Sequence, residues 1–260
     1  MRIAIIGAGN LATHLTKALI RGGHTVVQVF SRTEESASEL GCLTDVPYTC
    51  KLSEIVTDAE IYIFSVKDAV LEELVSKIAE GREHALFIHT AGSMPVDLFK
   101  DVTVHYGVLY PMQSFTKNRD VDFSTVPCFL EASSEEDLLL IRKLAGSVSG
   151  QLYELDSVKR KQLHLAAVFA CNFVNHCYAQ AADLLESHGI PFEVMLPLID
   201  ETAAKVHDIN PSDAQTGPAV RYDRNVIERH LKLLEADEMK STIYDLMSRS
   251  IHRTETLKKT

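Results

Sequence analysis

The sequence predicts an α/β protein: an N-terminal Rossmann domain with a doubly wound parallel sheet, followed by an all-α C-terminal domain. Two observations support this fold class. An apolar strand over residues 2–6 runs directly into a glycine-rich turn, and an amphipathic helix follows to about residue 20. Beyond residue 156, the periodic segments have the spacing of helices and none is a convincing strand. We therefore assign residues 1–156 to the first domain and residues 157–260 to the second.

The glycine-rich turn has the Gly-x-Gly-x-x-Gly/Ala pattern of a dinucleotide-binding βαβ unit. Gly7 allows the tight turn, Gly9 lets the backbone approach a pyrophosphate, and Ala12 lets the helix pack closely on the strand. The free N–H groups and the dipole of the helix N-terminus favour the phosphates. Gly7, Gly9, Asn10 and Leu11 are the first predicted cofactor contacts.

The end of the second strand, residues 25–30, indicates which nicotinamide cofactor binds. An NAD site usually has Asp or Glu there, which binds the ribose 2′-hydroxyl. This chain has Ser31-Arg32-Thr33 instead, and an Arg can bind a phosphate with two parallel hydrogen bonds. The sequence therefore predicts NADP, bound by Ser31, Arg32 and Thr33. In the alternative, Arg32 is a solvated surface residue, and Ser31 and Thr33 cap the helix that begins at Glu34.

Two further strand ends contribute to the predicted cofactor site. The strand over residues 59–65 ends at Ser65-Val66, and the strand over residues 85–89 is followed by Thr90-Ala91-Gly92. Because the carboxyl ends of parallel strands face the ligand crevice, we expect these five residues to contact the cofactor.

The rest of the first domain contains one irregular segment. His89 alternates with apolar residues and is expected to lie in the core with its ring hydrogen-bonded. Residues 105–115 are aromatic-rich and interrupted by Pro111, so we expect a loop that either forms a wall of the substrate site or packs against the fold. Strands over residues 126–130 and 151–155, with an acidic helix between them, complete this half.

Residues 157–187 predict one long helix. It carries no Lys, Arg, Asp or Glu between Lys161 and Asp183, which implies burial along much of its length. At 100° per residue, Lys161, His164, Asn172 and Asn175 fall on one face, which we expect to point into a liganded cleft. In the alternative, these groups satisfy one another or the neighbouring backbone.

Three more helices are predicted after Gly189-Ile190-Pro191, over residues 192–206, 223–235 and 237–256. Their apolar content exceeds what a small bundle can bury alone. We therefore expect a homodimer formed through the helical domain.

Composition limits the remaining possibilities. The chain has 260 residues, a formal net charge of −10, 46% hydrophobic residues and no long run of Lys and Arg, so nucleic-acid binding is not expected. It has no signal-peptide pattern and no run of 18 apolar residues, so we expect a cytoplasmic protein without a membrane span. The five cysteines form no Cys-x-x-Cys pair and are expected to be reduced, buried thiols. No metal site is predicted.

The whole chain resembles bacterial proteins in which a Rossmann-like domain precedes a C-terminal domain of unknown function 2520. That group is related to pyrroline-5-carboxylate reductase, the β-hydroxyacid dehydrogenases and the deazaflavin-dependent NADP reductases. The resemblance implies a second domain like that of 6-phosphogluconate dehydrogenase. It rests on the following residues: Gly7-Ala8-Gly9-Asn10, Ser31-Arg32-Thr33, His89-Thr90-Ala91-Gly92, Tyr110-Pro111-Met112-Gln113-Ser114-Phe115, His164 with Asn172, and Thr216-Gly217-Pro218 with Arg221, Asp223 and His230.

The chain departs from this group at two positions. The family usually has His before the Pro of the middle loop, where this chain has Tyr110. The β-hydroxyacid dehydrogenases carry Lys and Asn one turn apart on the interdomain helix, whereas Lys161 is followed one turn later by Leu165. Their mechanism is therefore not expected to transfer intact.

The predicted function is that of an NADP-dependent oxidoreductase, which transfers a hydride between NADP(H) and a small carbonyl or imine substrate in the interdomain cleft. His164 or Lys161 would donate the proton and Asn172 would orient the substrate; Tyr110 is a third candidate for the donor. Two alternatives stay open. One is hydride exchange between NADP and a flavin-like carrier, and the other is a non-catalytic NADP-binding sensor or assembly partner.

Overall fold

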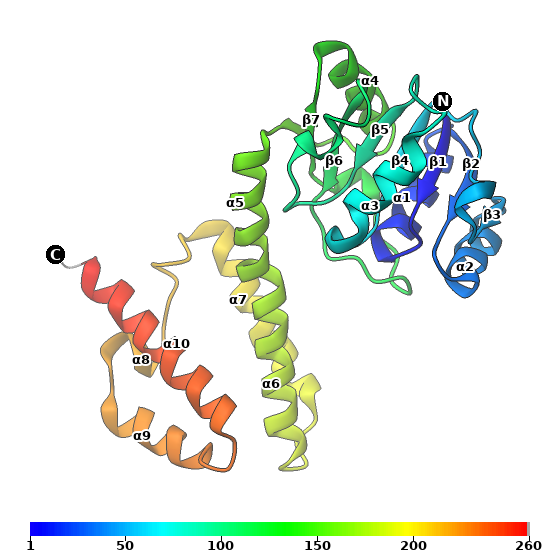
Figure 1. Ribbon diagram of the computed structural model, residues 1–260. Coiled ribbons are helices and arrows are strands. Elements are labelled where there is room, and N and C mark those ends of the chain that lie inside the picture. The colour runs from blue at the N-terminus through cyan, green and yellow to red at the C-terminus, as the bar shows by residue number, and fades with distance from the viewer. Residues whose placement is uncertain (259–260) are drawn as a thin grey trace. The chain divides into compact units, whose positions relative to one another are not determined.

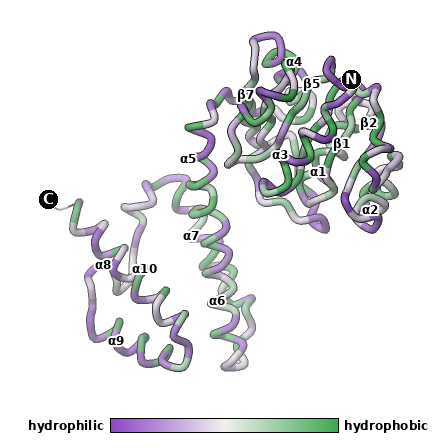
Figure 2. The backbone as a smooth tube through the Cα atoms, in the orientation of Figure 1, coloured by the Kyte–Doolittle hydropathy of each residue, from purple (hydrophilic) through white to green (hydrophobic). Residues whose placement is uncertain are grey.

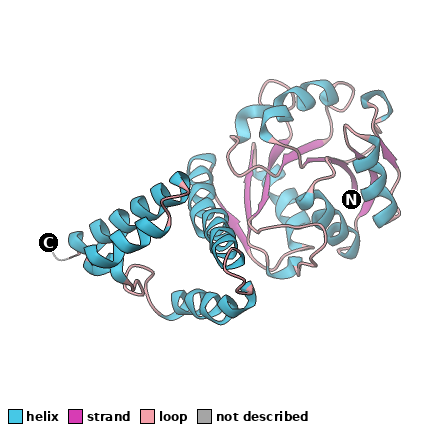
Figure 3. Cartoon of the chain, turned by 90° about the horizontal axis from the view of Figure 1, so that it is seen from below, coloured by secondary structure: helices cyan, strands magenta, loops and turns pink. Residues whose placement is uncertain are grey.

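The computed structural model describes residues 1–258 (Figure 1). The chain divides into two compact units, Met1–Asn172 and Phe173–Thr260. This division falls inside the long helix, whereas the predicted domain boundary falls between the last strand and that helix. The strands all belong to the first unit, and the described part of the second unit is helical (Figure 3).

A sheet of eight strands forms the centre of the first unit, in the order β3-β2-β1-β4-β5-β6-β7-β8. Strands β1 to β6 are parallel, β7 is antiparallel to β6, and β8 is parallel to β7. The predicted doubly wound fold is confirmed, with a reversal at β7 added. The bounds are β1 Arg2–Ile6, β2 Thr25–Phe30, β3 Tyr48–Thr49, β4 Ile61–Phe64, β5 Leu86–His89, β6 Tyr106–Pro111, β7 Cys128–Ala132 and β8 Leu152–Glu154.

Helices cover both faces of this sheet because buried strands expose apolar side chains on both sides. In β1, Ile3 and Ile5 pack on one side, and Ala4 and Ile6 pack on the other. The first face is covered by α1 (Asn10–Arg21), α2 (Glu34–Thr44) and α4 (Glu135–Gly146), and the second by α3 (Asp68–Ala79) with the short helix Val96–Phe99. Figure 2 shows the apolar strands inside this half.

The predicted loop over residues 105–115 is wrong for most of its length, since Tyr106–Pro111 forms β6. Aromatic and β-branched residues favour a half-buried strand, and Pro111 stands at its last position, where a missing N–H disturbs the ladder least. Gly107 is required at its own position, because a Cβ there would lie 2.4 Å from the backbone oxygen of Glu131 on β7.

The predicted long helix is present, but it is not uniformly α-helical. It comprises α5 (Ser157–Ala167), a π-helical stretch (Val168–Phe173) and α6 (Val174–Glu186). A π-helix has more residues per turn than an α-helix, so each residue rotates by less than 100° about the helix axis. The predicted assignment of side chains to one face, which assumed 100° per residue, therefore fails beyond residue 168. The expected burial is wrong for the single chain: among the described residues of α5 and α6, only Arg160 is buried.

The second unit also contains α7 (Leu196–Asp208), α8 (Pro218–Arg221), α9 (Arg224–Leu233) and α10 (Glu238–Leu257). The helices predicted over residues 223–235 and 237–256 are confirmed as α9 and α10, and the side chains of Asp223 and Asp237 cap their first turns. No helix in residues 1–258 has the length and apolar character needed to cross a membrane.

The five cysteines are free thiols. The prediction that all are buried is wrong: Cys128 is buried, whereas Cys42, Cys171 and Cys177 are exposed and Cys50 is intermediate. Cys171 and Cys177 are exposed for the same reason as their neighbours on the long helix, because nothing in the described chain covers that surface.

Candidate functional site

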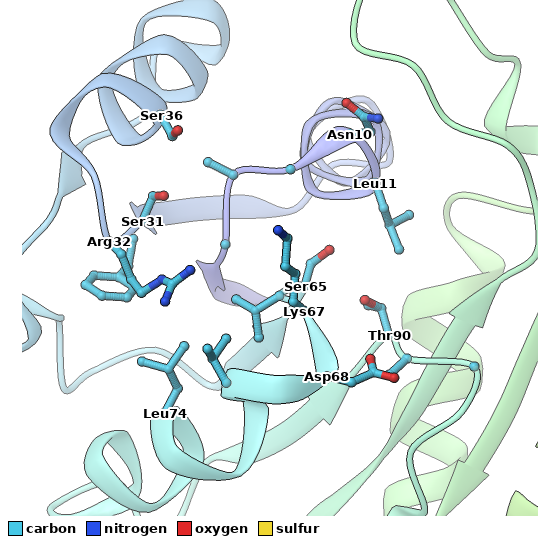
Figure 4. Close-up of a pocket in the computed structure, with 18 of the residues that line it drawn as sticks. Asn10, Leu11, Ser31, Arg32, Ser36, Ser65, Lys67, Asp68, Leu74 and Thr90 are labelled. Carbon is cyan, nitrogen blue, oxygen red and sulfur yellow. The ribbon is translucent and has the colours of Figure 1, made fainter.

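A cavity of about 500 Å³ opens at the carboxyl ends of β1, β2, β4 and β5 (Figure 4). We call it the glycine-loop cavity. Its lining residues are Gly7, Ala8, Gly9, Asn10, Leu11, Phe30, Ser31, Arg32, Ser36, Ser65, Val66, Lys67, Asp68, Val70, Leu74, Thr90, Ala91, Gly92, Tyr110 and His164. All predicted cofactor contacts except Thr33 therefore line one cavity, which is the crevice expected at the topological switch point.

The two glycines of the turn have different physical roles. Gly7 has a φ of +121°, and a Cβ on it would lie 2.1 Å from the backbone oxygen of Ser65 on the neighbouring strand. A Cβ on Gly9, by contrast, would meet no atom within 4 Å. Gly7 thus lets β1 and β4 approach, whereas Gly9 keeps the cavity open beside the N-terminus of α1. That helix has no side-chain cap and no acidic residue in its first turn, so its N–H groups suit a pyrophosphate.

The far end of the cavity is basic and hydroxylated. Arg32 points into it from the end of β2, with Ser31 beside it and Ser36 opposite on α2 (Figure 4). Neither Glu34 nor Glu35 lines the cavity, so no carboxylate takes the place of the NAD-type acidic residue. This donor set fits a 2′-phosphate. Thr33 instead caps α2, since its hydroxyl accepts the Ser36 N–H at 3.4 Å, as the alternative interpretation expected for that residue.

The loop after β5 is shaped by a buried histidine. His89 is fully buried, and its Nδ1 accepts the Ala91 N–H at 3.1 Å. Burial, with the nearby charge of Arg160, lowers the pKa of His89 to about 3. The ring is therefore neutral at physiological pH and holds the Thr90-Ala91-Gly92 turn in place. The core position predicted for His89 is confirmed, although its Nε2 has no hydrogen-bond partner in the described part of the chain.

A second cavity of about 710 Å³ adjoins the first, and we call it the Tyr110 cavity. Asn10, Leu11, Tyr110 and His164 line both cavities. Its full lining is Asn10, Leu11, Tyr110, Pro111, Met112, Gln113, Ser114, Phe115, Leu163, His164, Ala166, Ala167, Ala170, Cys171 and Asn172. A molecule in this cavity would therefore lie next to one in the glycine-loop cavity.

A hydrogen-bonded pair lies where the two cavities meet. The Tyr110 hydroxyl, from the end of β6, is 3.0 Å from Nδ1 of His164 on α5. Gly92 lets the ring approach, because a Cβ there would lie 2.6 Å from that same Nδ1. Burial raises the pKa of Tyr110, and the charge of Arg160 partly opposes this. Tyr110 is therefore protonated at neutral pH and holds a transferable proton beside both cavities.

A buried polar network holds α5 against the sheet one turn before His164. Arg160 is fully buried; it donates to the Glu131 carboxylate on β7 and, at 2.6 Å, to the backbone oxygen of Met94. The same carboxylate accepts the N–H and the hydroxyl of Ser157 at the start of α5, at 2.9 and 2.7 Å. This network fixes the start of α5 and with it the position of the His164 ring.

The structure brings together two of the four residues predicted on one face of the helix. His164 and Asn172 line the Tyr110 cavity, and Lys161 and Asn175 line neither cavity. Ala166 and Ala170 also line the cavity, although a rotation of 100° per residue places them outside the face of Lys161 and His164. The role of Lys161 as a proton donor stays a prediction that the geometry does not favour.

Sequence reasoning missed Ser36, Asp68 and the Arg160 network. Ser36 and Asp68 could have been found, because each lies in the first turn of a helix that follows a strand of the crevice. The carboxyl ends of such strands are where ligands bind in this fold. Arg160 had no such signal, because a charged residue in a helix is expected on its solvated face.

Comparison with known proteins agrees with this geometry. Residues 2–92 match the family described as NADP oxidoreductase, coenzyme F420-dependent, and residues 126–251 match the domain of unknown function 2520. No curated protein matches the chain.

Three solved structures share the whole fold. A crystal structure from Bacteroides fragilis, described as a "putative NADP oxidoreductase", is 55% identical over 97% of this chain and 98% of that chain, with a TM-score of 0.94. A Thermotoga maritima protein is 20% identical over 99% and 100% (TM-score 0.70). An imine reductase from Myxococcus stipitatus in complex with NADP+ is 17% identical over 99% and 95% (TM-score 0.71). The chain belongs to the NADP oxidoreductase family that joins an N-terminal Rossmann domain to a domain of unknown function 2520, and its cofactor is NADP.

Proposed function

We propose that this NADP oxidoreductase reduces a small carbonyl or imine compound in the Tyr110 cavity, and that the Tyr110–His164 pair donates the proton. The observation that carries the proposal is the position of this pair at the junction of the two cavities, with its 3.0 Å hydrogen bond. The imine reductase of the same fold is a catalyst of this reaction class by its description.

NADPH, when bound, supplies the hydride. The glycine turn, Arg32 and Ser36 bind its phosphates, and the Thr90-Ala91-Gly92 turn lies along the same cavity. As the substrate carbon accepts the hydride, its oxygen or nitrogen takes a proton from the Tyr110–His164 pair. Arg160 favours the resulting Tyr110 phenolate, and solvent then restores the proton. Asn172, in the π-helical stretch after α5, lines the Tyr110 cavity and would orient the substrate.

Substitution of the pair tests this role. Tyr110→Phe and His164→Gln should each lower kcat by about 10²–10⁴-fold while NADPH binding is retained. The double variant should lose little more, because groups that act as one unit are not additive. Lys161→Met, which changes a residue outside both cavities, is the matched comparison and should keep its kcat. Full activity in Tyr110→Phe would refute the proton-donor role.

The choice of NADP depends on Arg32. In Arg32→Asp, the Kd for NADPH should rise by 10²-fold or more, since a charge-assisted phosphate contact is replaced by repulsion. The Kd for NADH should change by less than about threefold. Calorimetry with both nucleotides measures this, and equal losses would contradict the assignment of Arg32 to the 2′-phosphate.

A second candidate acceptor is a deazaflavin carrier, favoured by the family to which residues 2–92 match. Tyr110 and Phe115 give the Tyr110 cavity two aromatic side chains against which such a ring could stack. The test is whether the enzyme reduces oxidised coenzyme F420 with NADPH, measured as the loss of the visible absorbance of F420. A positive result distinguishes this acceptor from a small ketone or imine.

We also propose that the enzyme works in the cytoplasm as a homodimer formed through its helical domain. The support is the set of exposed apolar side chains on the second unit, such as Leu198 and Val206 on α7. Light scattering on the purified protein should give twice the mass of the chain, and Leu198→Glu should shift it toward the monomer. A monomeric wild-type protein would rule this assembly out.

A further inference from the structure

The Tyr110 cavity contrasts with the glycine-loop cavity in its charge. The glycine-loop cavity contains two cations, Arg32 and Lys67, and the carboxylate of Asp68 (Figure 4). Among the described residues that line the Tyr110 cavity, none is Lys, Arg, Asp or Glu. The two cavities are therefore built for ligands of different chemistry, although they share the residues at their junction.

The charge of Arg160 acts on Tyr110, but this cation is not available to an anionic substrate. Arg160 is fully buried, and its guanidinium is bound by Glu131, Met94 and Ser157. Its Nε has no hydrogen-bond partner among residues 1–258, and that atom is buried as well. A carboxylate in the Tyr110 cavity would thus lose water without gaining an ion pair, and such desolvation is costly.

The remaining lining is apolar with neutral hydrogen-bonding groups. Leu11, Met112, Phe115 and Leu163 supply large apolar surfaces, and alanines of the long helix leave the space open. The side-chain oxygen of Gln113 accepts the Ser114 N–H at 2.8 Å, so part of its acceptor capacity is already used. Asn172 lines the cavity with a side-chain amide, which can bind one polar group of a ligand.

We infer that the substrate is an uncharged, mostly apolar ketone or imine that carries neither a carboxylate nor a phosphate. This inference rests on the proposed reduction in the Tyr110 cavity. It separates the chain from enzymes of the same fold whose substrates are acids, such as the pyrroline carboxylate reductase of Plasmodium falciparum, which shares 11% identity and shows the fold alone. The volume of about 710 Å³ is within the range of cavities that bind drug-sized molecules.

A matched pair of ketones tests the inference by activity. Methyl 2-oxo-4-phenylbutanoate and 2-oxo-4-phenylbutanoate have the same ketone position and the same phenylethyl side chain; the ester is neutral, and the acid carries one negative charge. We expect kcat/KM with NADPH to be at least 10²-fold higher for the ester. In Gln113→Arg, which adds a cation to the cavity wall, the ratio should fall toward one. A preference for the acid in the wild-type enzyme would overturn the inference and leave the proposed reduction intact.

A second measurement does not depend on turnover. Cys171 lines the Tyr110 cavity, and Cys42 is an exposed thiol on α2 that serves as the internal control. The protein is treated with a neutral hydroxyethyl methanethiosulfonate or the anionic sulfonatoethyl reagent, and modification of each thiol is followed by peptide mass spectrometry.

We compare, at each thiol, the rate of modification by the neutral reagent with the rate by the anionic reagent. The ratio of these rates should be at least tenfold higher at Cys171 than at Cys42. Gln113→Arg should lower the ratio at Cys171 alone. Equal ratios at the two thiols would overturn the inference. If the ratios differ as expected but neither ketone is reduced, the proposed reduction of such acceptors fails and the charge preference of the cavity stands.

Discussion

The two units of the chain are stabilised in different ways. In the first unit, the strands and the helices that cover them share a large buried apolar core, which includes Ile5, Tyr62 and Phe87. In the described part of the second unit, the buried residues are Ala219, Ile227 and Ser248. The same region exposes large apolar side chains, with Leu198 58% and Leu246 60% exposed. The first unit therefore has a complete core, and the second does not.

This difference bears on function as well as on stability. Both cavities are lined by residues of the first unit, from Gly7 to Asn172. The helical unit supplies exposed apolar faces, which are the surfaces that the proposed dimer would cover. Substitutions in the first unit should consequently act through burial and strain, and substitutions in the second through helix caps and assembly.

The largest effect is expected at the buried network of the first unit. Arg160→Met leaves the Glu131 carboxylate and the Ser157 hydroxyl without their charged partner, so the free energy of unfolding should fall by about 3–5 kcal/mol. Arg142→Met removes an ion pair with Glu154 that is exposed on both sides, and should cost about 1 kcal/mol or less. Urea titration measures both. Equal losses in the free energy of unfolding would show that burial does not determine how much each ion pair contributes to stability.

Next in size is the glycine turn. Gly7→Ala must adopt a positive φ and place Cβ against the Ser65 oxygen, so we expect a loss of at least about 2 kcal/mol in stability together with loss of NADPH binding. Gly9→Ala has open space for its methyl group, and its melting temperature should stay near that of the wild type while NADPH affinity falls. A stability loss in Gly9→Ala as large as in Gly7→Ala would contradict the two roles.

An element or site residue was predictable from the sequence where the residues that determine it are close together in the chain. The glycine turn, Ser31-Arg32 and the helices that begin at residues 223 and 237 were predicted because each depends on signals within a few residues of chain. The strand Tyr106–Pro111 was missed because its Pro and aromatic residues resemble a loop until the neighbouring strands are known.

The substrate side was less predictable for a related reason. The π-helical stretch after Ala167 changes which side chains share a face, and no residue type marks it in advance. Tyr110 and His164 are far apart in the sequence, so only the fold shows that they form a hydrogen bond.

An effect confined to acid pH is expected from His89. Its pKa is about 3 in the folded protein, below its ordinary value of 6.5, so the unfolded chain binds more protons between these values. The stability it contributes is complete above pH 6.5 and is lost toward pH 3, at up to about 1.4 kcal/mol per pH unit. In His89→Asn, which retains an acceptor for the Ala91 N–H, this slope should disappear. An unchanged slope in the variant would assign the acid sensitivity to other groups.

The smallest effect should come from the second unit, where helix caps act locally. The Asp237 carboxylate accepts the Lys240 N–H at 2.9 Å at the start of α10. Asp237→Ala should therefore cost about 1 kcal/mol, and Asp237→Asn, which can still cap, should cost a few tenths. Thermal unfolding at two protein concentrations separates this loss from any change in assembly, because only an assembly defect makes the shift depend on concentration. If Asp237→Ala instead destabilised the protein as strongly as Arg160→Met, α10 would belong to a core as complete as that of the first unit, and the contrast between the two units would fail.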